Sequence, residues 1–292
     1  MKSRIFEWLG VVTAIVYSLL VAANIGAEFI GFCLLLTSSA LIGIWAFLGK
    51  HKGILFLQFF YAAAGIIGMI RWFYMIVAYF WRVKPSAVPF ALVAMALDRF
   101  VLRSSSNVGF FKSLGTGKGE TFTPSDADAL RWGLIAHVHD IEAFDTSFVI
   151  KQWRKNSVSE FRAVIEPISS HGKWSQQEPF IPTVKDWDGQ VVAITRARIA
   201  WQQNFRFWRA VPPVTASLRS ASGLVAAIGI GEAPIGLQGT FSIWESPAAL
   251  RDFAYRGDAH SQAIAATAKY KWYSEELFAR FALRDMRGSI KD

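Results

Sequence analysis

Five histidines are the side chains best suited to bind a metal or move a proton in this 292-residue chain. His137 and His139 stand two residues apart in an alternating stretch, so both point to one face of a predicted strand. Two imidazoles on one face could ligate a metal, but an amphipathic strand explains the same spacing, and we favour that interpretation. His51 falls between apolar segments and is predicted to be polar or interfacial. His171 follows a predicted strand, where a loop can present a side chain to a cleft.

A glycine-rich stretch at 115–124, GTGKGETFTP, has the composition of a phosphate-binding loop. A Walker loop requires Gly-Lys followed by Ser or Thr, and a dinucleotide fingerprint requires Gly-x-Gly-x-x-Gly; the stretch fits neither template. The pattern Gly-x-Gly recurs at 229–231, again after an apolar run and before an alternating one. We therefore predict turns between paired strands, with positive φ at Gly117 and Gly231, and no binding of ATP or NADH.

Other catalytic patterns are missing from the sequence. There is no Ser-His-Asp order, no His-Glu-x-x-His helix and no convincing carboxylate pair, so hydrolysis is disfavoured; Glu275 and Glu276 are predicted to lie at a solvated helix end. The lone Cys33 excludes a disulfide framework or a cysteine metal cluster. The net charge of +9 contains no long run of like charges, so nucleic acid is an unsuitable partner, whereas anionic lipid headgroups suit it well.

The elements that must position these residues fall into two parts, because apolar composition is concentrated at the start of the chain. Between Trp8 and Ile70, formal charge is confined to Glu28, Lys50 and Lys52. Three apolar stretches there, with their flanks, are about long enough to span a bilayer as helices: 8–23, 29–48 and 54–70. We predict a three-helix transmembrane module over residues 1–72, with a buried soluble bundle as the alternative.

Three short helices joined by short loops resemble SemiSWEET-type half-transporter modules, although the proline–glutamine pair that marks those modules is missing. The resemblance implies contact with membrane lipid and a homo-oligomer formed through the module. We expect a multi-pass protein of the bacterial inner membrane. Basic residues flank the spans on both sides, so the positive-inside rule leaves the side of the C-terminal domain open.

Residues 73–292 are predicted to form two βαββαβ units of the ferredoxin-like type. The first has strands at 75–83, 108–114, 132–139 and 161–169, and helices at 86–102 and 141–150. The second has strands at 191–200, 224–230, 239–244 and 277–283, helices at 205–221 and 246–253, and an inserted helix at 260–270. The predicted class is α+β, with the two sheets packed face to face as a pseudo-dimeric α/β barrel.

From about residue 75 to its end, the chain resembles the spheroidene monooxygenase family, carotenoid 2-ketolases of purple bacteria. The matching segments keep their order: FFKSLGTGKGETFTP (110–124), SSHGKWSQQEPF (169–180), TRARI (195–199), FWRAVP (207–212), GIGEAPIGLQGTFSIWES (229–246) and HSQAIAATAKYKWYSEELFARF (260–281). The resemblance implies an O2-dependent oxygenase that contains haem, receives electrons from a ferredoxin-type donor and acts on a long apolar polyene. A preceding membrane module is not part of the family pattern, but it suits a substrate dissolved in lipid.

The same segments indicate residues of the site, although they identify no catalytic residue. His260 matches the family's His-x-x-Ala-Ile and is the first candidate for the haem-iron ligand. His171 stands where the family often has arginine, which suits contact with a haem propionate, and it is the second candidate ligand. The candidate salt partners of the propionates are Arg196, Arg206 and Arg209. The residues predicted to line the apolar substrate pocket are Trp174, Phe180, Trp208, Trp244 and Trp272.

Three functions are compatible with these features. We favour a membrane-tethered, haem-dependent monooxygenase of a carotenoid or another lipophilic substrate. The second is a non-catalytic module that binds haem or a hydrophobic ligand for its membrane partner. The third is a half-transporter whose soluble domain is regulatory. Turnover with O2 and a reductant separates the first two functions, and solute flux into liposomes tests the third.

Overall fold

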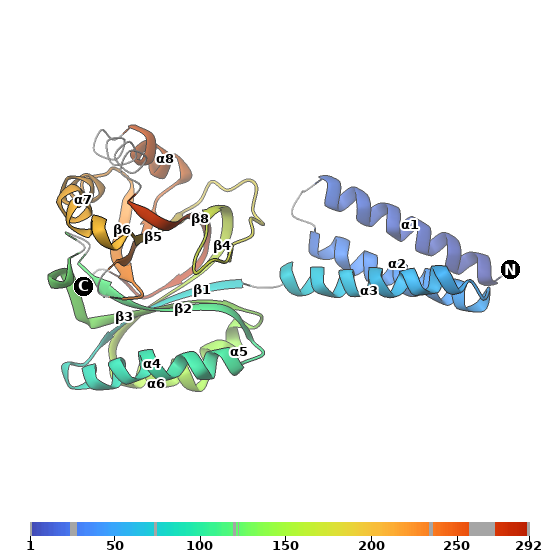
Figure 1. Cartoon of the computed structure of the whole chain (residues 1–292), viewed down its shortest axis with the longest axis horizontal. Coiled ribbons are helices and arrows are strands. Elements are labelled where there is room, and N and C mark those ends of the chain that lie inside the picture. The colour runs from blue at the N-terminus through green and yellow to red at the C-terminus, as the bar shows by residue number, and fades with distance from the viewer. Residues whose placement is uncertain are drawn as a thin grey trace. The chain divides into compact units, whose positions relative to one another are not determined.

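The computed structural model describes residues 2–23, 28–72, 75–118, 121, 123–233, 236–256 and 272–290. The chain divides into two compact units, Met1–Tyr74 and Met75–Asp292. The described part of the first unit consists of helices α1 (Lys2–Ala23), α2 (Glu28–Leu48) and α3 (Lys52–Trp72) (Figure 1).

The three helices of the first unit place large apolar side chains on the outside and small polar ones inside. Phe47, Phe56 and Phe59 are at least two-thirds exposed, whereas Ser38 and Gln58 are buried. The Ser38 hydroxyl donates a hydrogen bond of 2.8 Å to the carbonyl of Gly10, which joins α2 to α1. This is the reverse of a soluble bundle, and lipid would satisfy such a surface. By length and composition, Arg4–Ala22, Ile30–Leu48 and Lys52–Met69 could each cross a membrane.

The second unit contains strands and helices in one α+β arrangement, as predicted. Its strands are β1 (Met75–Val83), β2 (Val108–Gly117), β3 (Ala127–Val138), β4 (Ser157–Gly172), β5 (Val191–Ile199), β6 (Leu224–Gly231), β7 (Leu237–Trp244) and β8 (Tyr273–Arg287). Its helices are α4 (Val88–Ser104), α5 (Ile141–Asp145), α6 (Phe148–Asn156), α7 (Asn204–Arg219) and α8 (Pro247–Arg256). The inserted helix predicted at 260–270 lies outside the described residues.

One predicted helix, 141–150, is in fact two helices. Asp140 caps α5, because its side chain accepts a hydrogen bond of 3.0 Å from the backbone N–H of Ala143. Ser147 then caps α6 in the same way, accepting from the N–H of Ile150. A second N-cap residue so soon after the first ends one helix and begins the next.

The eight strands form a closed antiparallel barrel in the order β1-β3-β2-β6-β7-β5-β8-β4. Within it the first four strands are arranged β4-β1-β3-β2, and the last four repeat the same pattern as β8-β5-β7-β6. Pairing of β2 with β6 and of β4 with β8 joins the two halves. A closed barrel leaves no exposed sheet edge.

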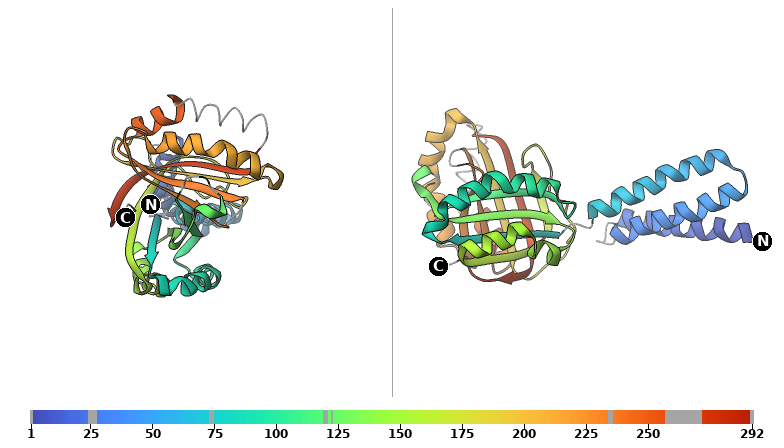
Figure 2. Two further views of the ribbon diagram at one scale, coloured as in Figure 1. Left: turned by 90° about the vertical axis from the view of Figure 1, so that its left-hand side faces the viewer. Right: turned by 90° about the horizontal axis from the view of Figure 1, so that it is seen from below.

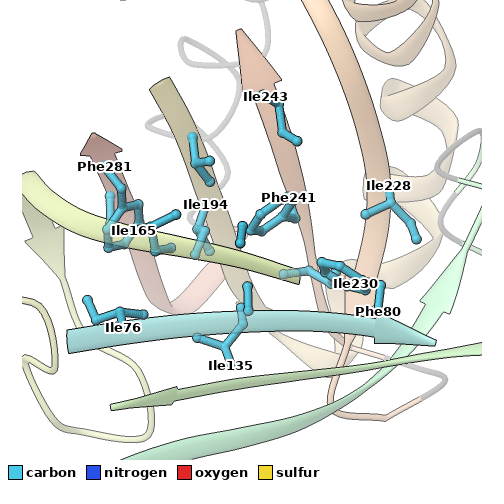
Figure 3. Packing of buried hydrophobic residues seen from close by; sticks show 14 of the residues in the cluster. Ile76, Phe80, Ile135, Ile165, Ile194, Ile228, Ile230, Phe241, Ile243 and Phe281 are labelled. Atoms are coloured by element: carbon cyan, nitrogen blue, oxygen red, sulfur yellow. The ribbon is translucent and has the colours of Figure 1, made fainter. Parts of the chain in front are cut away.

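Alternate residues of the strands fill the interior of the barrel with apolar side chains (Figure 3). Ile76 and Phe80 of β1 lie beside Ile135 of β3, and Phe241 of β7 contacts Phe80 at a ring-centroid distance of 5.1 Å. Because successive strand residues point to opposite faces, the intervening residues form a second, outward layer. The barrel therefore has a solid apolar core. Each four-stranded half also has an outer face, formed by its outward side chains, on which helices can pack.

The glycines of the repeated Gly-x-Gly pattern lie within strands and not in turns, so the turn prediction is wrong. Gly115 and Gly117 belong to β2 and pair with Gly231 and Gly229 of β6. Positive φ occurs in the described glycines Gly172, Gly223, Gly236 and Gly288 instead. A Cβ on Gly231 would lie 2.9 Å from the carbonyl oxygen of Leu237, so close backbone approach explains this glycine.

Helices α4 and α6 cover the outer face of the first half, and α7 and α8 lie on the opposite side of the barrel (Figure 2). Between the sheet and these two helices, the ring of Trp81 stacks on Tyr79 on one side and on Trp153 of α6 on the other, each at a centroid distance of 5.1 Å. The indole N–H of Trp153 donates to the Asp98 carboxylate at 2.8 Å. This face is thus filled completely by the protein's own side chains.

Candidate active site

The outer face of the second half carries small side chains at its centre. Thr195 of β5 is paired with Thr240 of β7, which is paired in turn with Gly229 of β6. Small residues also occupy neighbouring outward positions of β5, β6 and β7, namely Ala193, Ala197, Ala227 and Ser242, whereas Gln238 of β7 and Arg280 of β8 are longer. On β8 the outward Phe278 is 43% exposed. Thr195 and Thr240 are only half-buried although helices lie on this side of the sheet.

The two outer faces differ in the volume of their side chains. Outward positions of β1 hold Val77, Tyr79 and Trp81, which α4 and α6 bury completely. Among the described residues, the buried cluster on the second face is much smaller and centres on Val191, Ala193, Trp244 and Leu250. Because packed cores leave few voids, the small side chains that the described residues place under these helices make this face the candidate ligand site.

A hollow of about 510 Å³ lies between the C-terminal end of α7 and α8. Its lining consists of Ser217, Ser220, Ala221, Ser222, Ala249, Asp252 and Phe253. Ala221, Ala249 and Phe253 also pack against the cluster around Trp244, so the hollow adjoins the second outer face. Ligand sites in proteins are commonly concave and combine apolar walls with a few polar groups, as this hollow does.

Helix α7 turns a partly polar face inward. Asn204, Val211 and Thr215 are buried at helical spacing, whereas Arg206 and Arg209 lie on the exposed side. Within the described part of the chain, the indole N–H of Trp208 is buried without a hydrogen-bond partner, as is the side-chain carbonyl of Gln203 beside the helix start. A buried donor of this kind is rare, and a bound polar group would satisfy it.

Three of the five predicted pocket aromatics lie on this side of the sheet. Trp208 is half-buried on α7. Trp272 precedes β8, is buried and meets Phe207 of α7 edge-to-face at 6.1 Å. Trp244 points outward from β7, stacks near Phe253 at 5.1 Å and donates its indole N–H to Ser242 at 3.0 Å.

The other two predicted aromatics, Trp174 and Phe180, lie inside the barrel. The ring of Phe180 contacts Phe281 of β8 at 4.9 Å. Arg196 also points inward, because its partner across the β5–β8 pairing is the core residue Leu277. The predicted site residues are therefore divided between the two faces of the second sheet.

A network of ion pairs occupies one end of the barrel interior, and sequence reasoning missed most of it. Glu232 accepts hydrogen bonds of 2.9 Å from Lys112 Nζ, Trp174 Nε1 and Arg196 Nη2. Glu275 accepts from Arg196 Nη1 and from the backbone N–H groups of Ser175 and Gln176. Lys112 belongs to β2 of the first half. Arg196, Glu232 and Glu275 come from the second half, and residues 174–176 lie in the connection between β4 and β5.

The charges of this network balance, with two cations and two carboxylates. Burial alone would raise the pKa of Glu232, but the hydrogen bonds and charges of Lys112, Trp174 and Arg196 lower it below its ordinary value. Burial would likewise raise the pKa of Glu275. Hydrogen bonds from the backbone N–H of Gln176, from Arg196 and from the backbone N–H of Ser175 outweigh it, and the pKa is lowered. The predicted solvated helix end at Glu275 is wrong, because the residue lies in β8 and faces Arg196. Charged residues at inward positions of alternating strands were the available signal.

The histidines occupy different environments. His260 lies outside the described residues, and His171 is exposed near the end of β4. His137 points into the barrel between Phe110 and Phe180, at ring distances of 5.4 and 5.3 Å, and burial lowers its pKa to about 4. Among the described residues, no group of three or more His, Cys, Asp or Glu side chains could hold a metal ion.

Comparison with known proteins identifies relatives of the chain. It is 36% identical over 218 residues to spheroidene monooxygenase of Rhodobacter capsulatus, covering 70% of this chain and 87% of the relative. It is also 36% identical over 204 residues to spheroidene monooxygenase of Rubrivivax gelatinosus, covering 66% and 77% of the two chains. The chain matches no protein-family model.

A solved structure of aldoxime dehydratase shares the fold, with a TM-score of 0.50 over 73% of this chain and 82% of that one, at 10% sequence identity. At this identity the likeness concerns the fold alone. The sequence relatives are more informative, because their identity is high and the first is covered almost throughout. The chain belongs to the spheroidene monooxygenase family.

Proposed function

We propose that this protein is a membrane-tethered monooxygenase that oxidises a carotenoid, or another lipophilic substrate, with O2. Family membership makes the chain an oxidoreductase with monooxygenase activity. The relatives are named for spheroidene, a carotenoid, which supports a long apolar polyene as the substrate class. The apolar helices α1 to α3 support a tether and contact with membrane lipid, and through them the protein would form a homo-oligomer in the bacterial inner membrane.

The two halves of the barrel act in this proposal as a pseudo-dimer with divided roles. Both halves have the same order of strands, and each has helices on its outer face. The first half fills that face with Tyr79, Trp81 and Trp153 and is structural. The second half keeps small residues there and carries the site. This contrast between the two outer faces is the observation on which the location of the site depends.

Three features of the second outer face support haem as its cofactor. A porphyrin is flat and largely apolar, and the small side chains around Thr195 and Thr240 leave room for a plane against the sheet. The buried indole N–H of Trp208 is a neutral donor for an anionic propionate. Arg206 and Arg209, on the exposed side of the same helix, are the cations proposed to meet a propionate at the rim. His260 would supply the nitrogen ligand, with His171 second. Bound haem would supply activation of O2, with electrons from a ferredoxin-type donor.

Arg196 is less suited to a propionate than its sequence context suggests. Its guanidinium is 2% exposed and is already paired with Glu232 and Glu275 inside the barrel. Trp174 and Phe180 belong to the same interior and would support the sheet from behind. The substrate is then expected beside Trp208, Trp244, Trp272 and the exposed Phe278, on the side of α7 and α8.

The test is to load the full-length protein with haem in detergent and record its spectrum. We expect a sharp Soret band in the wild type, and we expect Thr240→Phe, which fills the small-residue face, to abolish it. Thr240→Ser, which keeps that face small, is the matched control and should retain the band. His260→Ala should shift or remove the band while circular dichroism stays unchanged.

Each outcome of the haem experiment has a defined meaning. An unaltered spectrum in His260→Ala would transfer the ligand assignment to His171. Haem binding that survives Thr240→Phe would place the cofactor elsewhere. Haem binding with no turnover of carotenoid, O2 and reductant would favour a non-catalytic ligand-binding module over the monooxygenase.

A further inference from the structure

Helix α4 carries a large apolar face that points away from the barrel. On its inward side Ala91, Ala94 and Leu102 are buried, and Phe90 and Met95 are partly buried against the same core. Its outward face carries Leu92, Val93, Leu97, Phe100 and Val101, each between 46 and 58% exposed. Surface helices of soluble domains have the opposite polarity, with their apolar stripe toward the core. The segment Pro85–Ser104 is even apolar enough to be a candidate membrane span, although α4 covers a sheet.

Basic side chains border this apolar face. Arg99 and Arg103 are exposed near the end of α4. On the neighbouring helix α6, Lys151 and Lys155 are exposed on the same stripe as Phe148, which is 67% exposed. The exposed acidic residues of this side are Asp140 and Glu142, at the start of α5. Apolar residues bordered by Lys and Arg are typical of helices that lie in the interface of an anionic bilayer.

We propose that the outward face of α4, with Phe148 of α6, is a membrane-docking surface that rests among the headgroups of an anionic bilayer. Covalent continuity supports lipid as the occupant. Only residues 73 and 74 separate α3 from β1, and three peptide links reach at most about 11 Å. If α3 spans the membrane, this short connection keeps the start of β1 close to the bilayer, so lipid is within reach of the barrel.

This inference depends on the membrane tether of the proposed function and not on haem. Its consequence is an orientation: an interfacial helix buries its apolar face about 5–10 Å into the headgroup and acyl boundary. The first half of the barrel would then face the lipid. The α7 and α8 side would then lie on the opposite side of the barrel from the docking surface.

The test uses full-length protein in liposomes that contain phosphatidylglycerol, with Cys33→Ser as background. Single cysteines are introduced at Leu97 on α4, at Phe59 on α3 as the lipid control and at Arg251 on α8 as the water control; Phe59 is 80% exposed. A bimane label at each site is quenched either by nitroxide lipid or by aqueous iodide. Val93→Cys is a second α4 probe in case the Leu97 variant folds poorly.

We expect the Leu97 label to be quenched by nitroxide lipid and to be at least about threefold less accessible to iodide than the Arg251 label, as interfacial burial requires. Replacing Arg99 and Arg103 by Glu should remove this difference in iodide access, and liposomes of pure phosphatidylcholine should do the same. Iodide access equal to that of Arg251 would overturn the proposal. So would shielding from both quenchers together with disulfide cross-linking between copies, which would show that a second chain covers the face. The label at Phe59 distinguishes failure of the membrane tether from failure of the docking surface. If nitroxide lipid quenches the Phe59 label but not the Leu97 label, the tether is retained and the docking surface is rejected.

Discussion

Gly115 of β2 faces Gly231 of β6 across the seam that joins the two halves of the barrel. Gly117 and Gly229 form a second such pair in the same short ladder. The repeated Gly-x-Gly pattern therefore brings two copies of one sequence feature together in space. The close backbone contacts lie within each copy's own hairpin: a Cβ on Gly231 would lie 2.9 Å from the carbonyl oxygen of Leu237, and one on Gly117 would lie 3.0 Å from that of Asp126.

The two glycines that face each other across the seam should respond differently to substitution. Gly231→Ala places a Cβ 2.9 Å from the carbonyl oxygen of Leu237, whereas Gly115→Ala meets its nearest atom at 3.7 Å. We expect Gly231→Ala to lower the free energy of unfolding by about 1–3 kcal/mol, as overpacking does, and Gly115→Ala to change it little. Thermal unfolding measured by circular dichroism compares the two variants. Equal effects would show that close approach is not the reason for the glycine at 231.

The ion-pair network inside the barrel predicts a large cost for losing its central cation. Arg196 joins Glu232 to Glu275, and Arg196→Gln would leave these carboxylates without their shared partner. We expect a loss of about 3–5 kcal/mol in the free energy of unfolding, because an uncompensated buried charge remains. Arg198→Gln, on the same strand but exposed, is the matched control and should be almost neutral. A small effect of Arg196→Gln would mean that water reaches this end of the barrel.

His137 predicts a pH dependence of stability. Its pKa is lowered to about 4 by burial, from 6.5 when exposed, so between these values the unfolded chain binds a proton that the folded chain does not. Stability contributed by neutral His137 is therefore present above about pH 6.5 and is lost as pH falls toward 4, by up to about 3 kcal/mol. Denaturant unfolding at several pH values should show this slope in the wild type and a reduced slope in His137→Phe. An unchanged slope would assign the effect to other groups; His171→Phe, at an exposed position, controls for loss of an imidazole.

The barrel should fold without the helices that precede it. The described core clusters of the second unit contain only residues from position 76 onward, and strand pairing is closed within that unit. A fragment that begins at Trp72 should show a cooperative thermal transition in mild detergent, which covers the apolar face of α4. A transition that is broad or missing would mean that the first unit contributes to the core.

Much of the fold could be predicted from the sequence, because periodicity and turn residues act locally. The predicted strand at 75–83 coincides with β1, and the predicted helix at 205–221 differs from α7 by one or two residues at its ends. The break between α5 and α6 depended on the side chain of Ser147, which acts as a cap only in its folded context. The glycine seam depended on contacts between residues more than 100 positions apart, which no local pattern reveals.

The candidate site was less predictable for the same reason. A tryptophan in a family segment can point to either face of a strand, and a one-residue change in register exchanges the faces. Trp174 and Trp244 were therefore grouped together although one lies inside the barrel and the other outside. Nothing in the sequence around Glu232 or Lys112 predicts that the two residues form an ion pair, because their 2.9 Å contact exists only in the folded barrel. The small residues Thr195 and Thr240 became informative only when compared with Tyr79 and Trp81 on the equivalent outer face of the first half.

Oxygen transfer from O2 to a carotenoid tests the central claim most directly. The full-length protein, co-produced with spheroidene in a host that makes this carotenoid, would be supplied with ¹⁸O2, and the extracted pigment analysed by mass spectrometry. We expect the wild type to give a carotenoid product that carries ¹⁸O. The Thr240→Phe variant should give no such product, whereas Thr240→Ser should still give it. Unmodified carotenoid from cells that contain the folded, membrane-bound wild type, or a product whose oxygen comes from water, would contradict it.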